Sequence, residues 1–172
     1  IVALTASCGL MLKFEWPLIL PGNEAVKRIA AATRDISEYI VELSRDHGLA
    51  PGLQSLPATV TLHHACHARA QNMGAKSAQM LRLIPNATIE LIERCSGHGG
   101  TFGVMKETRP AAVKVGKPAA RQIAKKEGDV LCSDCPLACK HLGQLVSAEL
   151  PEGKAAPQQA SPIEIFARAY GL

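Results

Sequence analysis

The stretch that decides the fold is Val130-Leu131-Cys132-Ser133-Asp134-Cys135-Pro136-Leu137-Ala138-Cys139-Lys140-His141. A short apolar run leads into a Cys-x-x-Cys turn, and Pro136 then opens a predicted helix that extends to about Leu150. This spacing suits two thiolates on one metal ion or cluster, because the turn brings both sulfurs to one side. The stretch therefore predicts a strand, a ligand-bearing turn and a helix, in that order.

Two further cysteines, Cys66 and Cys95, each follow an apolar run of their own, at residues 58–62 and 88–93. Strands that alternate with helices in this way predict an α/β fold with a parallel sheet built from βαβ units and flanked by helices. Functional groups gather at the carboxyl ends of the strands in such sheets. We therefore expect Cys66, Cys95, Cys132 and Cys135 to lie at this edge of the sheet.

Other elements follow from periodicity and from turn residues. The expected elements are a strand at 1–4, a turn at 5–9, a short helix at 10–16 stopped by Pro17, helices at 24–33 (capped by Asn23) and 35–45, a strand at 59–63, a helix at 75–83, a strand at 88–93, a helix at 106–126 interrupted near 116–118, a strand at 129–132, a polar linker at 152–161 and a helix at 162–170.

Composition limits the class of protein. The 172 residues are 47% hydrophobic, which suits one large domain or one domain plus part of another. Aromatic residues make up only 3%, and the net charge of +4 is small and spread along the chain, so we expect no nucleic-acid partner. We find no run of 18 apolar residues and no secretory signal, and we expect a cytoplasmic protein or one peripheral on the inner membrane.

The chain contains six cysteines, an even number that also admits disulfides. A chain of this length with this many core residues does not need disulfides for stability, so metal binding is the preferred interpretation. Structural or redox disulfides and inert cysteines remain as alternatives.

An internal repeat relates the first residues to the Cys-x-x-Cys stretch. Residues 3–10 align with residues 130–137, so that Cys8 matches Cys135 and Thr5 matches Cys132. The first residues thus resemble the tail of a preceding copy of the same unit. We expect the chain to be the C-terminal part of a longer polypeptide.

These motifs together resemble a known family. Cys66-His67, Cys95-Ser96-Gly97 and Cys132-x-x-Cys135-Pro136 are similar to the cysteine-rich (CCG) domain that occurs in subunits of heterodisulfide reductase and of anaerobic glycerol-3-phosphate dehydrogenase. Residues 93–103 look especially like the glycerol-3-phosphate dehydrogenase branch. The resemblance divides the chain into the end of a first CCG-like unit with a helical connection (1–57), a complete unit (58–150), and a linker with a C-terminal helix (151–172).

The chain departs from the family at Ser96, which replaces the second cysteine of Cys-Cys-Gly. The resemblance associates five thiolates with an unusual non-cubane cluster. Here Cys66, Cys95, Cys132 and Cys135 remain, which suits an ordinary [4Fe-4S] cluster. A structural zinc site with the same four ligands is the alternative.

Histidines surround the predicted ligands. His63, His64 and His67 flank Cys66, and His98 lies among the glycines after Cys95. These imidazoles are candidates to bind a second metal or a haem, or to hydrogen-bond to the cluster or the backbone. Cys8 is a further candidate ligand, or binds nothing, because its partner position is Thr5.

The resemblance implies an iron–sulfur electron-transfer subunit rather than a catalytic one. Its electrons would come from a flavin dehydrogenase subunit and pass toward quinone or another membrane-linked acceptor. The alternatives are a thiol/disulfide reductase of the heterodisulfide type, against which the missing cysteine at Ser96 counts, and a zinc-stabilised interaction module.

Overall fold

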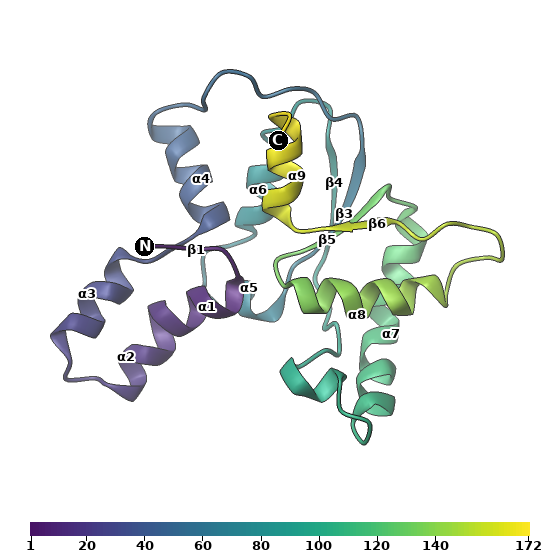
Figure 1. The fold of residues 1–172 in the computed structure, drawn as a ribbon, viewed down its shortest axis with the longest axis horizontal. Helices are drawn as coiled ribbons and strands as arrows, with labels where there is room; N and C mark the ends of the chain where they lie inside the picture. Colours follow the sequence, from purple (N-terminus) through teal and green to yellow (C-terminus); the bar gives the residue numbers. More distant parts are fainter.

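The protein contains two parallel sheets of different size, connected and covered by helices (Figure 1). The computed structural model describes all 172 residues. Its elements, in chain order, are β1 (Val2–Ala3), α1 (Ala6–Leu10), the π-helical η1 (Met11–Glu15), α2 (Trp16–Ile19), α3 (Glu24–Ala32), β2 (Arg34–Asp35), α4 (Ile36–Asp46), β3 (Thr59–His63), α5 (Cys66–Ala70), α6 (Lys76–Leu81), β4 (Thr88–Ile92), the 3₁₀-helical η2 (Gly100–Gly103), α7 (Arg109–Lys126), β5 (Val130–Ser133), α8 (Pro136–Ser147), β6 (Gln158–Ala160) and α9 (Pro162–Ala169).

The larger sheet has four parallel strands in the order β4-β3-β5-β6. All four residues of β5 are buried, as are four of the five in β3, because helices cover both faces of the sheet. The predicted α/β fold with a parallel sheet is therefore confirmed.

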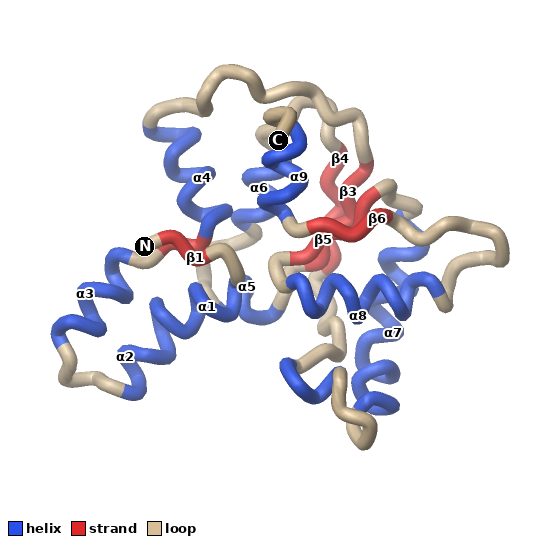
Figure 2. The backbone as a smooth tube through the Cα atoms, viewed as in Figure 1, coloured by secondary structure: helices blue, strands red, loops and turns tan.

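Two hydrophobic clusters lie on opposite faces of this sheet. On one face α6 and α9 pack against β3 and β5, with Met80, Leu81 and Phe166 among the buried side chains. On the other face α7 and α8 bury Ile123, Leu142 and their neighbours against Leu131. Figure 2 shows the strands between these two helix layers. The connection from β3 to β4 and the connection from β4 to β5 run in opposite directions across the sheet, because β4 and β5 lie on opposite sides of β3. Since crossovers between parallel strands are right-handed, this reversal places helices on both faces.

The smaller sheet repeats part of the larger one. In the first 46 residues β1 leads through helices to the parallel β2 and then to α4, and in the last part β5 leads through α8 to the parallel β6 and then to α9. Helices α4 and α9, which end the two parts, both begin with a reciprocal capping box, Asp35 with Glu38 in α4 and Ser161 with Glu164 in α9. The internal repeat seen in the sequence thus recurs in the topology.

The predicted helix end at Pro17 and the predicted interruption near residues 116–118 were both wrong. Residues 6–19 are continuously helical, and Pro17 lies at the start of α2, directly after the widened π-helical turn η1. Likewise α7 continues through Pro118, which is exposed, since its opposite side is anchored in the core by buried alanines and Ile123. Asn23 caps α3 as predicted, accepting hydrogen bonds from the amides of Ala25 and Val26 at 3.0 and 3.2 Å.

The predicted linker at 152–161 contains a strand instead of irregular chain at its end. β6 adds to the edge of the sheet beside β5, and α9 then packs into the core through Ile165 and Phe166. None of the helices is at once long and apolar enough to cross a membrane.

Candidate metal centre

Three cysteines follow the ends of three neighbouring strands. His63 at the end of β3 is in register with Ile92 of β4 and with Ser133 of β5, so the three strands end in one row. Cys66 comes three residues after this row on β3, Cys95 three residues after it on β4, and Cys135 two residues after it on β5. Parallel strands thus deliver these cysteines to the same edge of the sheet.

The centre of this edge is the point where the chain direction across the sheet reverses. β3 and β5 are neighbours, yet the connection after β3 leads to one side of the sheet and the connection after β5 leads to the other. Such a reversal opens a crevice at the carboxyl ends of the two strands, where α/β proteins bind ligands. The loops carrying Cys66 and Cys135 lie on either side of this crevice.

A buried histidine ties the three strand ends together. His63 is only 1% exposed, and its Nδ1 lies 2.9 Å from the hydroxyl of Ser133 while its Nε2 lies 2.9 Å from the carbonyl oxygen of Arg94. Ser133 is in the Cys-x-x-Cys turn, and Arg94 immediately precedes Cys95. Burial lowers the pKa of His63, which favours the neutral ring that can accept from one partner and donate to the other.

Asp134 makes the corresponding tie on the other side. Its carboxylate accepts a hydrogen bond at 3.2 Å from the amide of Ala65, the residue before Cys66, and another from the hydroxyl of Ser77 on α6. The Ser77 hydroxyl also lies 3.1 Å from that of Ser37 on α4. The two residues between Cys132 and Cys135 therefore fix the positions of the other two cysteine loops.

The four predicted sulfur ligands differ in accessibility. Cys66 and Cys95 are exposed and Cys135 is partly buried, whereas Cys132 is fully buried in the cluster formed with α6 and α9. Burial raises the pKa of the Cys132 thiol well above its ordinary value, which opposes formation of the thiolate that binds metal. Three of the thiols are thus accessible at this edge, whereas Cys132 is enclosed in the core.

Backbone amides support two of these loops. The amide of Gly97 donates to the sulfur of Cys95 at 3.4 Å, and the amide of Cys135 donates to the Ser133 hydroxyl at 3.3 Å. Gly97 has φ +77°, and a side chain there would overlap the Ala112 carbonyl of α7, so the Cys95 loop lies directly on that helix.

No group of three or more His, Cys, Asp or Glu side chains is arranged to hold one metal ion in this structure. The ligand set Cys66, Cys95, Cys132 and Cys135 therefore stays a prediction. The structure adds two residues that the sequence analysis did not single out, Ser133 and Asp134, and it shows both ring nitrogens of His63 bonded to protein atoms rather than free for a metal. Their role depends on contacts across about 30 and 70 residues of sequence, which no local pattern indicates.

The other three candidate histidines occupy different environments. His67 is exposed on α5, and His64 is buried with its Nδ1 3.3 Å from the Glu93 carboxylate and its Nε2 without a hydrogen bond. His98 is buried beside His141 of α8, with 6.0 Å between the ring centroids. Burial lowers the pKa of His141, assisted by the charge of Arg109 and opposed by the Ala112 carbonyl.

The two remaining cysteines are on helices rather than in the loops that follow this row of strand ends. Cys8 is exposed on α1, which packs beside α5, where the Gln71 side-chain amide donates to the Ala6 carbonyl at 3.1 Å. Cys139 is buried on α8, and its thiol faces the carbonyl oxygens of Leu131 and Ala160 at 3.5 and 4.0 Å. A ligand role for Cys8 therefore stays a prediction.

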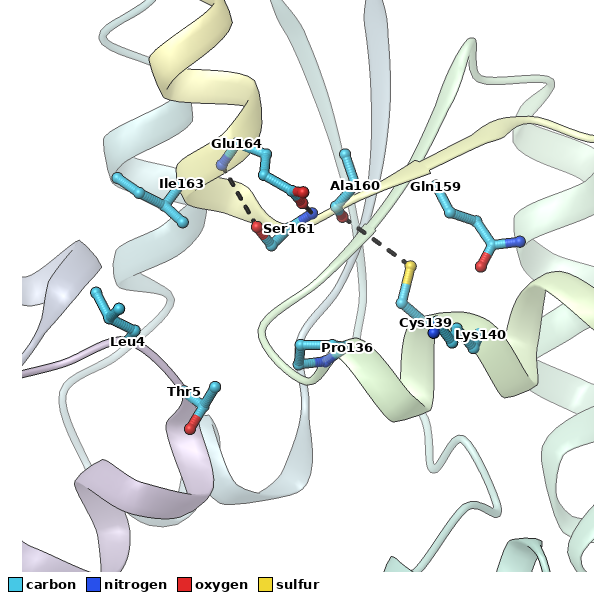
Figure 3. A pocket seen from close by; sticks show the side chains of 10 residues that line it. All are labelled: Leu4, Thr5, Pro136, Cys139, Lys140, Gln159, Ala160, Ser161, Ile163 and Glu164. Atoms are coloured by element: carbon cyan, nitrogen blue, oxygen red, sulfur yellow. Dashed lines mark hydrogen bonds between the residues drawn. The ribbon is translucent and has the colours of Figure 1, made fainter. Parts of the chain in front are cut away.

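A cavity of about 460 Å³ separates the first residues from α8 and β6 (Figure 3). Thr5 and Leu4 form one wall, and Cys139, Pro136 and Ser161 lie on the opposite side. None of the four predicted ligand cysteines lines it. The cavity therefore marks the boundary between the two related parts of the chain, not the predicted metal centre.

The region that carries the three loops also matches a known family. Residues 60–142 match the sequence profile described as the cysteine-rich domain, CCG. This part of the chain is a CCG cysteine-rich domain. The match begins in β3 and ends in α8, so the CCG domain contains all four predicted ligands and the ties made by His63 and Asp134.

Curated relatives of this chain include components of oxidoreductases. One subunit of the anaerobic glycerol-3-phosphate dehydrogenase of Escherichia coli is 29% identical over 143 residues, which are 81% of this chain and 35% of the relative. Lactate utilization protein A from Geobacillus thermodenitrificans is 33% identical over 60% of this chain and 45% of its own. One subunit of the fumarate reductase (CoM/CoB) of Methanothermobacter marburgensis is 27% identical over 87% of this chain and 28% of its own. The chain thus spans less than half the length of each of these relatives.

Proposed function

We propose that this chain is the iron–sulfur electron-transfer part of a dehydrogenase or reductase complex. The observation that carries the proposal is the row of strand ends at which His63 and Asp134 hold the loops of Cys66, Cys95 and Cys135 together. The likeness to subunits of two oxidoreductases supports the same class of function.

In this proposal Cys66, Cys95, Cys132 and Cys135 hold a [4Fe-4S] cluster. Such a cluster supplies one-electron transfer with little rearrangement of its sulfur-rich shell. The chain's own part is to position the thiolates, to exclude water from the inner side of the edge, and to stabilise charge on sulfur through the Gly97 amide. Binding by Cys132 requires its thiol to turn out of the core.

The proposal extends to the partners of this chain. We propose that a flavin dehydrogenase subunit donates the electrons and that quinone or another membrane-linked carrier accepts them. This places the chain in the cytoplasm or on the inner face of the membrane. It is also consistent with the chain being part of a longer protein, as the short coverage of its relatives suggests.

Anaerobic purification followed by iron, sulfide, zinc and haem analysis tests the proposal. We expect iron and sulfide in equal amounts, a brown protein, and a paramagnetic signal after reduction. Cys66→Ser, Cys95→Ser and Cys135→Ser should each lose iron and sulfide together. Cys139→Ala is the matched control, since this buried cysteine lies outside the row of strand ends and should keep the full content.

Three outcomes would contradict or revise this proposal. Zinc without sulfide would make the chain a zinc-stabilised interaction module. Turnover of a disulfide substrate by the isolated chain would favour a thiol/disulfide reductase. Full iron content in Cys132→Ser would remove this residue from the ligand set.

A further inference from the structure

Two buried histidines inside the CCG domain make no hydrogen bond through three of their ring nitrogens. His98 and His141 are 6% and 4% exposed, and the buried nitrogens without a partner of normal hydrogen-bond geometry are Nε2 of His98 and both nitrogens of His141. The Ala112 carbonyl lies near His141 and raises its pKa, but does not meet that geometry. His63 is the internal comparison, since it is equally buried yet both of its nitrogens lie 2.9 Å from a partner. A buried polar atom without a partner is rare, and it calls for a ligand that the protein atoms do not supply.

The two rings come from separate elements that other contacts hold together. His98 belongs to the glycine-rich loop before η2, and His141 lies on α8. The guanidinium of Arg109 donates to the carbonyl of Gly103 at 3.0 Å and to the side-chain oxygen of Gln144 at 2.8 Å, which joins the end of that loop to α8 one turn beyond His141. The loop also closes tightly on His98, whose carbonyl accepts from the Gly103 amide at 2.6 Å.

The separation of the rings suits one metal ion between them. With metal–nitrogen bonds of about 2.0–2.1 Å, two imidazoles on one ion have ring centroids about 5.2 Å apart at a tetrahedral angle and about 6.4 Å apart when opposite each other. The observed 6.0 Å, at an angle of 49° between the ring planes, falls within that range.

From these observations we infer that His98 and His141 form a second metal site that is separate from the four cysteines. Paired imidazoles select a borderline divalent ion such as Zn²⁺ or Fe²⁺, with the remaining positions filled by water or by an incoming ligand. Neither histidine lines the cavity of about 460 Å³ between the first residues and α8, so the two sites are distinct. The inference does not depend on the iron–sulfur proposal, since it uses no thiolate.

Zinc binding to the full metal-free chain tests the inference. X-ray absorption at the zinc edge separates the ligands, because bonds to nitrogen are about 2.0–2.1 Å and bonds to sulfur about 2.3 Å. We expect a nitrogen component in the wild-type protein, and its loss, together with one equivalent of zinc, in His98→Ala and in His141→Ala. The sulfur component should stay unchanged in both variants.

The matched control is His47→Ala, because this exposed histidine ends α4 far along the chain from the pair and should keep the nitrogen component. A zinc shell of sulfur alone in the wild-type protein would overturn the inference whether or not the variants fold. So would an unchanged zinc content in a folded His141→Ala protein. Failure of the iron–sulfur proposal has a different signature, the absence of sulfide-bound iron in the reconstituted wild-type chain.

Discussion

At the scale of single residues, the predicted metal centre depends on side chains that do not themselves bind metal. His63 is the clearest case, because its ring is hydrogen-bonded to Ser133 in the Cys-x-x-Cys turn and to the carbonyl of Arg94 just before Cys95. Hydrogen bonds inside a protein are stronger when the surrounding medium is apolar, and a fully satisfied ring makes the three strand ends one rigid unit. The loops that carry Cys95 and Cys135 are therefore held together before any metal arrives.

The reactivity of the six thiols gives a prediction at this scale. In native protein freed of metal by a chelator, we expect iodoacetamide to modify Cys8, Cys66 and Cys95 rapidly and Cys135 more slowly, following their exposure. Cys139 should react only on unfolding, because burial raises its pKa to about 11 and leaves roughly one thiolate in a thousand at pH 8. Peptide mass spectrometry after timed labelling measures the order. Rapid labelling of Cys132 would show that its thiol leaves the core, as a four-thiolate cluster requires.

A second prediction concerns Asp35, the buried N-cap of α4. Burial raises its pKa, with Asp134 and Glu38 adding to the effect, although the hydrogen bond from the Ser37 amide opposes it. Between the ordinary pKa of an aspartate and the raised pKa of Asp35, the folded state keeps a proton that the unfolded state has lost. The stability that Asp35 contributes is therefore complete at low pH and is lost as the pH rises through this window. Asp35→Asn keeps the cap and should remove that fall, which urea unfolding at a series of pH values measures.

The control for Asp35 is the exposed Asp46, whose pKa is lowered by its hydrogen bond with Arg45. Its effect on stability therefore changes with pH in the opposite direction. Asp35→Ala should instead cost about 0.5–2 kcal/mol at all pH values, because the cap itself is lost. A pH profile of Asp35→Asn identical to that of the wild type would contradict the assignment.

Local patterns predicted where the cysteines lie but not which way each one points. The strand ends and the loops of Cys66 and Cys95 follow from alternating apolar runs. The alternation of side chains along β5 places Cys132 on the same face as Val130, inside the core, and that signal was present in the sequence. The ties made by Ser133 and Asp134 could not be predicted, because they join residues 69 or 70 apart.

At the scale of elements, α7 shows how tertiary contact overrides local preference. Gly116, Lys117 and Pro118 together favour a break in a helix, yet α7 runs through them. Gly116 is there because the Cys95 loop passes so close that a side chain would overlap the Ser96 carbonyl and come within 2.6 Å of Leu145. The residue that weakens the helix is the one that lets the loop dock.

Gly116→Ala tests this account of α7. The added methyl group cannot be accommodated without moving the Cys95 loop or Leu145, so we expect a loss of about 1–3 kcal/mol in stability despite the better helix propensity of alanine. Urea unfolding measures the change, and iron content reports the displaced loop. Gly22→Ala is the matched control, since nothing lies within 4 Å of a side chain there and its stability should stay near that of the wild type.

At the scale of the whole molecule, the two related parts of the chain pack around α6. Helix α4 from the first part and α9 from the last both contact α6, so the units share one core. The sequence repeat predicted the relation between residues 3–10 and 130–137 but not β6. Two of the three residues of β6 are exposed glutamines, so the strand exists only through its pairing with β5.

The hydrogen-bond chain from Ser37 through Ser77 to Asp134 is one polar connection between these units, and Ser77→Ala should break it. The substitution leaves the Asp134 carboxylate without its side-chain donor and the buried Ser37 hydroxyl without its partner. Because hydrogen bonds to charged groups contribute about 1.5–3 kcal/mol, we expect a loss of stability in that range.

Hydrogen exchange should speed up in α4 and in the loop before Cys66 more than in α7. Ser147→Ala, which removes only a bond to the Gly143 carbonyl within α8, should cost less and leave α4 protected. Equal exchange in both variants would mean that apolar packing around α6, not this polar chain, couples the first unit to the metal centre.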